Sequence, residues 1–353
     1  MAIAAGGTAG HLVPALALAD ALTARGARVF FIGTGKGLEA KLVPGCGYEL
    51  EIADLRGLER RLTFKLLLLL WSLLKGSLDC LGIMRRQFPD VVVGFGGYVS
   101  AQPVLAAALM RRPRLIVELD SHMGLANRML APLADRVALS FALPEKKGGK
   151  YMLTGRPLSR KLLEADPVRG RGKFGLADNR PIVLMTGGSL GARTVNMAAV
   201  EAFGSGPLPF QLVHVSGQRD YEMVKDRLNR QNADLENYHL LDYTDDLPLV
   251  MAAADLIVGR SGASVQEIAA LGKPALLVPY PFATARHQQR NAEWMAAAGA
   301  AEVIEDSELS GAALKERVVA LLEDSDRLEV MAQSSRNLAR RDGAGRIAAE
   351  VLG

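Results

Sequence analysis

The chain has 353 residues, more than the roughly 250–300 at which a single hydrophobic core stops growing, so we expect two domains. Hydrophobic residues make up 49% and charged residues 23%, which excludes a disordered chain and a coiled coil. The net charge of +4 suits phosphate ligands or an anionic membrane face, and because no basic patch is interleaved with aromatic residues, we expect no nucleic-acid partner. Cys46 and Cys80 lack the number and spacing of a disulfide framework or a C-x-x-C site, so both are expected to be core thiols.

Short apolar runs alternate with helical patterns along nearly the whole chain, which predicts βαβ units and an α/β fold with parallel sheets. The N-terminal residues lack the basic region of a signal peptide, so we expect no export. The strands expected in the first half are 28–32, 91–94, 114–118 and 136–139, and the helices are 12–25, 64–88 and 101–110.

The leucine-rich segment 62–74 is interrupted by Lys65 and is shorter than the roughly 18 apolar residues that a membrane span needs. It fits a buried helix, and its arginine and lysine neighbours also fit a helix at a membrane surface.

A second βαβ series begins at Pro181, with strands expected at 181–186, 210–216, 239–242, 256–259 and 275–278. Residues 143–179 between the two series are rich in Gly, Pro, Lys and Arg, with TGRPLSR at their centre. We therefore place the domain boundary near Arg160, between a first domain of residues 1–159 and a second that begins at 160.

Each series opens with an apolar strand, a glycine turn and a helix. The turns are GGTAGH at 6–11 and GGSLGAR at 187–193, and a third glycine loop, GFGGYVS, occupies 94–100. Such turns bring backbone N–H groups close to a phosphate at a helix N-terminus, although any one of them could be only a tight turn. Neither a Walker loop nor a clean dinucleotide fingerprint is present, so ATP hydrolysis and an NAD-dependent oxidoreductase are disfavoured.

Two side chains are candidates for chemistry. His11 lies at a helix start, where the dipole favours a neutral imidazole that can act as a general base, or the ring makes only a structural hydrogen bond. Glu267 follows Ser261, Gly262 and Ser264 at another helix start, where phosphate and ribose could be held. Its spacing from Ser264 also fits a capping box.

Five segments together resemble the MurG family of glycosyltransferases: GGTAGHLVPALALADAL, PDVVVGFGGYVSAQPVLAA, GLANRMLAPLADRVALSF, GGSLGARTVN and SGASVQEIAALGKPALLVPYP. The resemblance implies a GT-B architecture, in which two Rossmann-like, doubly wound domains face a cleft. In that architecture a C-terminal helix, at about 335–353 in this chain, packs back on the first domain, so that the second spans 160–334. It also implies inverting transfer of N-acetylglucosamine from UDP-GlcNAc to lipid I, a lipid-linked muramyl-pentapeptide pyrophosphate, giving lipid II. The enzyme would be cytoplasmic and peripheral on the inner face of the cell membrane, with the segment 62–74 as its membrane-docking patch.

The resemblance also implies site residues. His11 would be the base and Glu267 would hold the ribose hydroxyls. Residues implied to bind the donor are Thr8, Ala9, Gly10, Asp120, Asn127, Arg156, Ser189, Thr244, Ser261, Gly262, Ala263, Ser264, Val265, Gln266, Glu267 and Gln288. Residues implied to face the acceptor pyrophosphate are Gly7, Gly10, Gly96, Gly97 and Tyr98.

Several positions depart from the family pattern. Ala9 replaces a glycine, Asp120 an asparagine and Leu190 a glutamine, and Ser159 takes the place of an arginine that is displaced to Arg156 or Arg160. These changes leave the choice of sugar and acceptor open.

We expect no cofactor and no required metal, because no spaced Asp-x-Asp occurs in a suitable loop. The negative charge on the leaving group would instead be stabilised by Ser189, Ser261, backbone amides and Arg193 or Arg260. A related UDP-sugar transferase with another acceptor, an epimerase-like isomerase of UDP-GlcNAc and a non-catalytic binding module remain alternatives.

Overall fold

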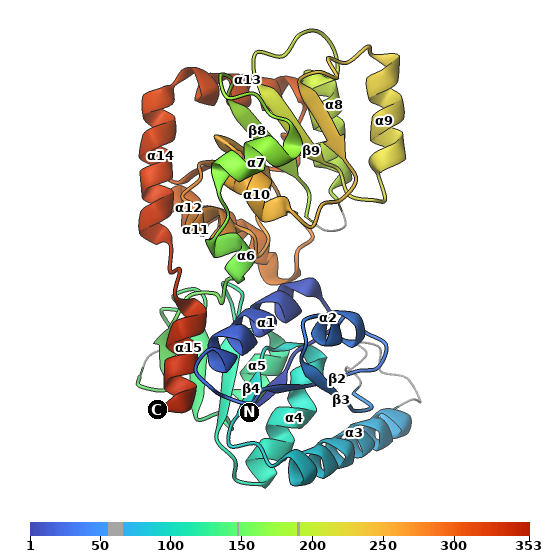
Figure 1. Cartoon of the computed structure of the whole chain (residues 1–353), viewed down its shortest axis with the longest axis vertical. Helices are drawn as coiled ribbons and strands as arrows, with labels where there is room; N and C mark the ends of the chain where they lie inside the picture. The colour runs from blue at the N-terminus through green and yellow to red at the C-terminus, as the bar shows by residue number, and fades with distance from the viewer. Residues whose placement is uncertain (56–65, 147, 189–190) are drawn as a thin grey trace. The chain divides into compact units, whose positions relative to one another are not determined.

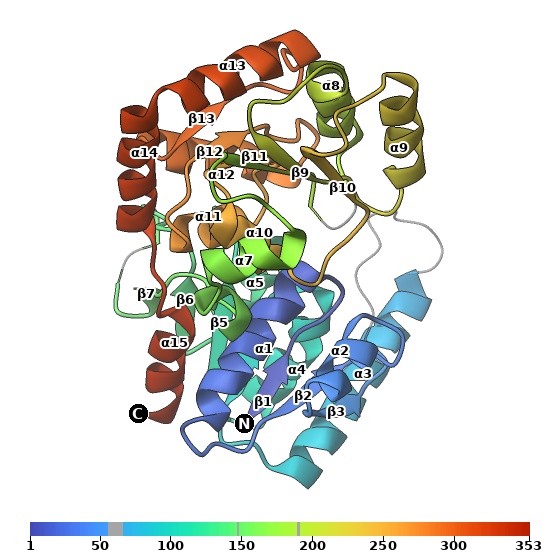
Figure 2. The ribbon, with the colours of Figure 1, turned by 45° about the horizontal axis from the view of Figure 1, so that its top comes forward.

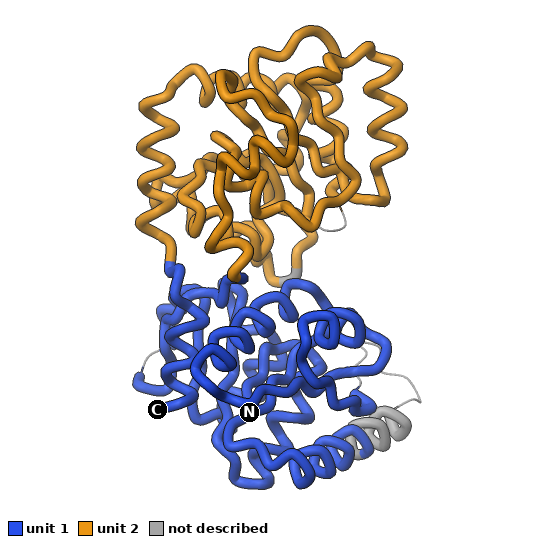
Figure 3. Tube along the Cα trace, in the orientation of Figure 1, with its two compact units in different colours: residues 1–159, 340–353 blue, residues 160–339 orange. Residues whose placement is uncertain are grey.

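The computed structural model describes the backbone of residues 1–55, 66–146, 148–188 and 191–353, and all of their side chains except those of 66–74 and 284. The chain forms two compact units (Figure 3). Unit 1 contains Met1–Ser159 and Arg340–Gly353, and unit 2 contains Arg160–Ala339. The chain therefore passes from one unit to the other twice, at 159/160 and at 339/340 rather than at 334.

Unit 1 is built on a parallel sheet that has seven strands in the described residues, in the order β3-β2-β1-β4-β5-β6-β7. The strands are β1 (Ala2–Ala4), β2 (Phe30–Gly33), β3 (Glu49–Ile52), β4 (Val92–Gly94), β5 (Arg114–Glu118), β6 (Arg136–Leu139) and β7 (Tyr151–Leu153). The helices are α1 (Ala9–Thr23), α2 (Glu39–Gly45), α3 (Leu66–Gln87), α4 (Gly97–Leu109), α5 (Leu125–Leu130) and α15 (Gly343–Leu352).

Alternate side chains of the central strands of unit 1 enter two different cores, one on each face of the sheet. Phe30 and Val92 pack with the side chains of α4 and the end of α3, whereas Phe31 and Val93 pack with those of α1. The second core also includes Ile347 of α15, which packs against α1 (Figure 1). Unit 1 is thus doubly wound, and its last helix comes from the far end of the chain.

Unit 2 repeats this plan with six described strands in the order β10-β9-β8-β11-β12-β13, all parallel (Figure 2). The strands are β8 (Ile182–Thr186), β9 (Gln211–Val215), β10 (Tyr238–Leu241), β11 (Leu256–Gly259), β12 (Ala275–Leu277) and β13 (Ala301–Val303). The helices are α6 (Arg160–Leu163), α7 (Pro167–Phe174), α8 (Arg193–Phe203), α9 (Tyr221–Arg230), α10 (Leu247–Ala253), α11 (Val265–Ala270), η1 (Thr284–Arg286), α12 (His287–Ala297), α13 (Gly311–Glu323) and α14 (Ser325–Leu338).

The two sheets confirm the prediction of an α/β chain with two parallel-sheet units. Three strands were missed by the sequence analysis: β3, β7 and β13, which all lie at sheet edges.

The expectation of two core thiols is wrong for Cys46, which is exposed beyond the end of α2. Cys80 is buried, and burial raises the pKa of its thiol to about 12.

Both sheets have a topological switch point, at which the strand order reverses and ligands of open α/β sheets bind beyond the carboxyl ends of the strands. In unit 1 this point lies between β1 and β4, and in unit 2 between β8 and β11. The segments that follow these four strands are 5–11, 95–98, 187–193 and 260–267. They contain the three glycine loops and the Glu267 segment that the sequence analysis selected.

Candidate active site

The two glycine loops of unit 1 flank its switch point. Gly7, Gly96 and Gly97 have φ angles of 81°, 79° and 66°, the left-handed region that glycine adopts without strain. A Cβ on Gly7 would lie 3.4 Å from the ring of Tyr98, so the first turn and the start of α4 are neighbours. The predicted acceptor residues Gly7, Gly96, Gly97 and Tyr98 therefore lie around one point of the sheet.

His11 lies in the first turn of α1 and is held by Thr8, the N-cap residue. The Oγ1 atom of Thr8 is 2.9 Å from Nδ1 of His11, and Thr8 makes no side-chain cap to the helix backbone. Nδ1 is thus engaged, while Nε2 has no partner among the described residues. This hydrogen bond orients the ring, and it leaves Nε2 as the nitrogen that can exchange a proton with a ligand.

Arg156 forms a hydrogen bond to the backbone at the start of α1, next to His11. Pro14 within α1 has no N–H, so the carbonyl oxygen of Gly10, four residues earlier, lacks its helical donor. Nη2 of Arg156 donates to this oxygen at 2.8 Å, and the Arg156 side chain is buried. The predicted donor ligand Arg156 is therefore bound to the backbone of the first turn.

The environment of His11 keeps its ring neutral. Burial lowers the pKa of His11 below 6.5, the positive charge of Arg156 lowers it further, and the negative charge of Asp120 opposes both. A neutral imidazole at neutral pH is the form that accepts a proton.

A cavity of about 650 Å³ in unit 1 brings many of the predicted residues together. Its polar lining includes His11, Asp120 and Asn127. Asn127 is buried and donates to Val117 O at 3.0 Å and to a Glu118 oxygen at 2.9 Å, while its Oδ1 has no partner among the described residues. That oxygen is a buried acceptor at the wall of a cavity, and a substrate hydroxyl or amide N–H would satisfy it.

Two buried glutamates were not selected by the sequence analysis as site residues. Glu118 accepts hydrogen bonds from the backbone N–H groups of Asp120 and Gly124, which shapes the loop after β5. Burial raises the pKa of its carboxyl. Glu39 accepts from Gly7 N at 3.2 Å, so this amide of the first turn already has a partner. The amides of Thr8, Ala9 and Gly10 are then the ones left for an anion at this turn.

In unit 2 the turn between β8 and α8 is tightly packed against the loop after β9. A Cβ on Gly191 would lie 2.2 Å from Ser216 O, and Gly188 and Gly191 have φ angles of 83° and 75°. Ser189 and Leu190 lie outside the described residues, so the predicted role of Ser189 stays a prediction.

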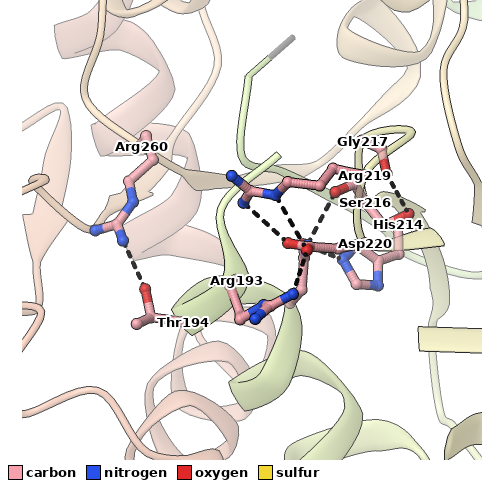
Figure 4. Close-up of polar contacts among 9 residues, drawn as sticks. Arg193, Thr194, His214, Ser216, Gly217, Arg219, Asp220 and Arg260 are labelled. Atoms are coloured by element: carbon pink, nitrogen blue, oxygen red, sulfur yellow. Dashed lines mark hydrogen bonds and ion pairs between the residues drawn. The ribbon is translucent and has the colours of Figure 1, made fainter. Parts of the chain in front are cut away.

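Beside this turn two arginines converge on one buried carboxylate (Figure 4). Nη2 of Arg193 lies 3.3 Å from Asp220, and Nε and Nη2 of Arg219 each lie 3.2 Å from it. Burial by itself would raise the pKa of Asp220, but the hydrogen bonds and charges of Arg219 and Arg193 hold it below its usual range. The side chains of the two arginines are 63% and 60% exposed, so they remain open to an anionic ligand.

Asp220 is also the end of a buried polar network. Asn196 donates to Asp220 at 3.2 Å and to Ser216 O at 2.9 Å, and its Oδ1 lies 3.0 Å from Nε2 of His214. Nδ1 of His214 lies 2.8 Å from the hydroxyl of Tyr238. Burial lowers the pKa of His214 to about 4, so the network contains a neutral histidine.

Arg260, proposed from sequence as one of two arginines near the leaving group, is already bound within unit 2. Its side chain is 9% exposed, and its guanidinium donates to Thr194 Oγ1 at 2.5 Å (Figure 4). The guanidinium also pairs with Asp306 at 2.6 Å and donates to Val278 O at 3.1 Å. Arg193 is therefore the better of the two candidates to meet an anion.

The segment after β11 places the other predicted donor residues. Ser261 is buried and donates to Gln288 O at 2.8 Å, and Oε1 of Gln288 accepts from Tyr280 N at 3.0 Å. Ser264 is the N-cap residue of α11 but makes no side-chain cap, so the Ser264 half of the capping-box alternative is absent. Gly262 and Ala263 precede the N-cap, and Val265, Gln266 and Glu267 form the first turn of α11.

Thr244, the remaining predicted donor residue, accepts a hydrogen bond from Asp246 N at 3.0 Å. Asp246 itself pairs with Lys161 at 3.0 Å and with Lys173 at 3.1 Å.

The residues that the structure describes hold no cluster of three or more metal-ligating side chains. Among those same residues, no helix combines the length and apolar character needed to cross a bilayer.

Comparisons with known proteins identify the family and the fold class. Residues 1–139 match the glycosyltransferase family 28 N-terminal domain, and residues 182–347 match the C-terminal domain of that family. Proteins from Moorella thermoacetica and Halorhodospira halophila are 40% and 39% identical to the chain, covering 96% and 99% of it and 94% and 96% of their own length. Both bear the name UDP-N-acetylglucosamine–N-acetylmuramyl-(pentapeptide) pyrophosphoryl-undecaprenol N-acetylglucosamine transferase.

Among solved structures, MurG from Acinetobacter baumannii is 27% identical and superposes with a TM-score of 0.79 over 99% of this chain and 98% of that one. A UDP-GlcNAc 2-epimerase from Neisseria meningitidis is 16% identical, with a TM-score of 0.71 over 99% of this chain and 98% of its own, and shares the fold alone. The fold class is thus the GT-B class expected from the sequence. From its length, its two domains and its relatives, the chain belongs to the MurG family of glycosyltransferases.

Proposed function

We propose that the chain transfers N-acetylglucosamine from UDP-GlcNAc to the muramyl sugar of lipid I, with inversion, and so forms lipid II. The observation that carries the proposal is the sequence identity of this chain to the N-acetylglucosamine transferases named above, which is 34–40% over 94–99% of the chain. The hydrogen-bonded pair of Thr8 and His11 supplies a base at the switch point of unit 1, in agreement with such a reaction.

His11 serves as the general base in this proposal. Thr8 accepts a hydrogen bond from Nδ1–H, which leaves the lone pair on Nε2 to take the proton of the acceptor hydroxyl as the bond to the anomeric carbon forms. Such proton transfer contributes roughly 10²–10⁴ in rate. The amides of Thr8, Ala9 and Gly10 and the loop of Gly96, Gly97 and Tyr98 face the acceptor pyrophosphate.

The donor is assigned to unit 2, with Glu267 on the ribose hydroxyls and the turn 187–193 on the diphosphate. As the bond to UDP breaks, negative charge grows on the leaving oxygen, and Arg193 supplies a fixed positive charge that Asp220 holds in place. We propose that this charge makes a metal dispensable. Full turnover after removal of divalent cations by a chelator is the expected result, and its loss and recovery with Mg²⁺ would refute this part.

The acceptor lipid is assigned to the cavity that contains His11. Leu105, Leu125, Met129 and Leu133 line it, and all four side chains are exposed. We propose that these side chains meet the apolar part of the lipid at the anionic inner face of the cell membrane, where the enzyme is peripheral. Replacing Leu125 and Met129 by glutamate should weaken sedimentation with phosphatidylglycerol vesicles, and unchanged sedimentation would contradict the assignment.

The deciding experiment measures UDP release from UDP-GlcNAc with and without a short-chain lipid I analogue. Release that depends on the acceptor, with a new disaccharide product, is the expected result. Conversion of UDP-GlcNAc without acceptor would favour an epimerase, and binding without turnover would favour a binding module. A His11→Ala variant that binds UDP normally and keeps full turnover would remove the assigned base.

A further inference from the structure

The carboxylate of Glu39 lies beneath the first glycine turn and is fully buried. Its Oε2 accepts from Gly7 N at 3.2 Å, and its Oε1 accepts from Thr34 N at 3.1 Å and from Thr34 Oγ1 at 2.6 Å. Glu39 thereby joins two loops that lie far apart in sequence: the turn after β1 and the loop after β2. A carboxylate removed from water needs such donors, and here each oxygen has at least one.

Three glycines make room for this carboxylate. A Cβ added to Gly6, Gly33 or Gly37 would lie 2.6, 2.8 or 2.2 Å from atoms of the Glu39 side chain, closer than real Cβ contacts. No such crowding by Glu39 would arise if its side chain pointed to solvent. The backbone of both loops is therefore shaped around a buried glutamate.

The carboxylate is charged at neutral pH. Burial alone would raise the pKa of Glu39, but the hydrogen bonds from Thr34 and Gly7 lower it below its ordinary value. Hydrogen bonds to an ionised acceptor are stronger than neutral ones, so the bond to Gly7 N restrains the turn more firmly than an amide oxygen would.

From Gly7 the restraint passes directly to the candidate base. Gly7 has a φ of 81°, and Thr8 follows it in an extended conformation with φ of −139° and ψ of 154°. That conformation brings Thr8 Oγ1 to 2.9 Å from Nδ1 of His11. A carboxylate that fixes Gly7 therefore also fixes the residue that orients the histidine.

We propose that Glu39 is a positioning residue for the transfer reaction, acting through Gly7 and Thr8 to orient the His11 ring. Two consequences follow for ligand binding. The Gly7 amide is turned toward Glu39 and away from the acceptor, and an anion at this turn must use the amides from Thr8 onward. The part of the inference that concerns turnover rests on the proposed function, whereas the orientation of His11 does not.

The test compares Glu39→Gln with Val43→Ala. Glutamine keeps the size of the side chain but has only one acceptor oxygen. Its NH₂ group would therefore point at a donor, either Gly7 N–H or Thr34, and one of these hydrogen bonds would be lost. Val43 is fully buried in the same helix, α2, and touches neither loop through a hydrogen bond that the structure records. It reports what a loss of packing in α2 does by itself.

Two readouts separate positioning from a general loss of stability. The first is acceptor-dependent UDP release, for which Glu39→Gln should lower kcat about 10- to 100-fold and leave the KM for UDP-GlcNAc unchanged, since misplacement by about an ångström has effects of this size. The second is the titration of His11, followed by NMR of histidine-labelled protein and assigned with a His11→Asn variant. Its pKa should rise in Glu39→Gln toward the ordinary 6.5 as the released ring loses part of the burial that lowers it, whereas loss of the Glu39 charge by itself would lower it further.

Val43→Ala should change neither readout while the protein is folded. If Glu39→Gln does not fold, Thr34→Val serves in its place, because it removes the 2.6 Å bond and leaves the carboxylate, and it should give a smaller shift in the same direction. An unchanged His11 titration in the Glu39 or Thr34 variant overturns the inference. If the wild-type protein shows no transfer, the proposed function fails, and the titration still decides whether Glu39 orients His11.

Discussion

Replacement of His214 by glutamine should make unit 2 less sensitive to acid. His214 is fully buried, and burial lowers its pKa to about 4, against 6.5 in the unfolded chain. Between these values the unfolded chain binds a proton that the folded unit does not, so folding stability is lost as the pH falls from 6.5 toward 4. Lowering the pH from about 7.5 to about 5 should therefore cost about 2 kcal/mol through this one group. Glutamine has no such proton to gain.

The assay is urea unfolding at the two pH values, followed by the fluorescence of Trp294 in unit 2. The chain has two tryptophans, so a Trp71→Phe background leaves Trp294 as the only indole. Other titrating groups contribute equally to both proteins and cancel in the comparison. His214→Gln should lower the stability at neutral pH, since it alters bonds to Asn196 and Tyr238, but the further loss at low pH should be about 2 kcal/mol smaller than in the parent. Equal pH dependence in the two proteins would refute the assignment of a buried neutral histidine.

Three further predictions concern the same two sheets. Asp120→Asn removes a negative charge that raises the pKa of His11, so the acidic limb of the kcat/KM profile should move to lower pH, and a limb that stays in place would exclude His11 as the titrating base. Asp306→Ala leaves the nearly buried guanidinium of Arg260 without its carboxylate and should destabilise unit 2 by about 3 kcal/mol in urea unfolding, whereas a loss within error would show that the pair is dispensable. Gly259→Ala would place a Cβ 2.2 Å from a carbonyl oxygen of β8 and should cost about 1–3 kcal/mol in the same assay, unless the strands can separate without loss.

The sequence predicts the central strands well because they are buried on both faces and read as continuous apolar runs. The expected strands 114–118, 136–139 and 256–259 coincide with β5, β6 and β11. The strands that escaped detection have a partner on one side only, and two of them carry glutamates: β3 has Glu49 and Glu51, and β13 has Glu302. Charges and short length are common at sheet edges, so the local pattern there does not differ from that of a loop.

The candidate site divides in the same way. Glycine turns and helix starts are local features, and the turns Gly6–His11 and Gly187–Arg193 can be found from their spacing alone. Glu39 and Asp220 were missed because the partners that tie them to the glycine turns, Gly7 and Arg193, belong to other βα units. Pro14 did contain a signal: a proline within a helix frees the carbonyl four residues earlier, and the structure shows that Arg156 fills that vacancy.

The position of α15 has a consequence for how the protein is made. Ile347 and Ala348 are fully buried in the core of unit 1, but the ribosome adds them only after every residue of unit 2. Unit 2 is continuous in sequence and contains all of its own core, whereas unit 1 must wait for residues made after unit 2, with the α15 side of α1 uncovered. The unit that is translated first is thus the one that finishes folding last, and its uncovered surface is the part of the nascent chain most in need of protection from aggregation.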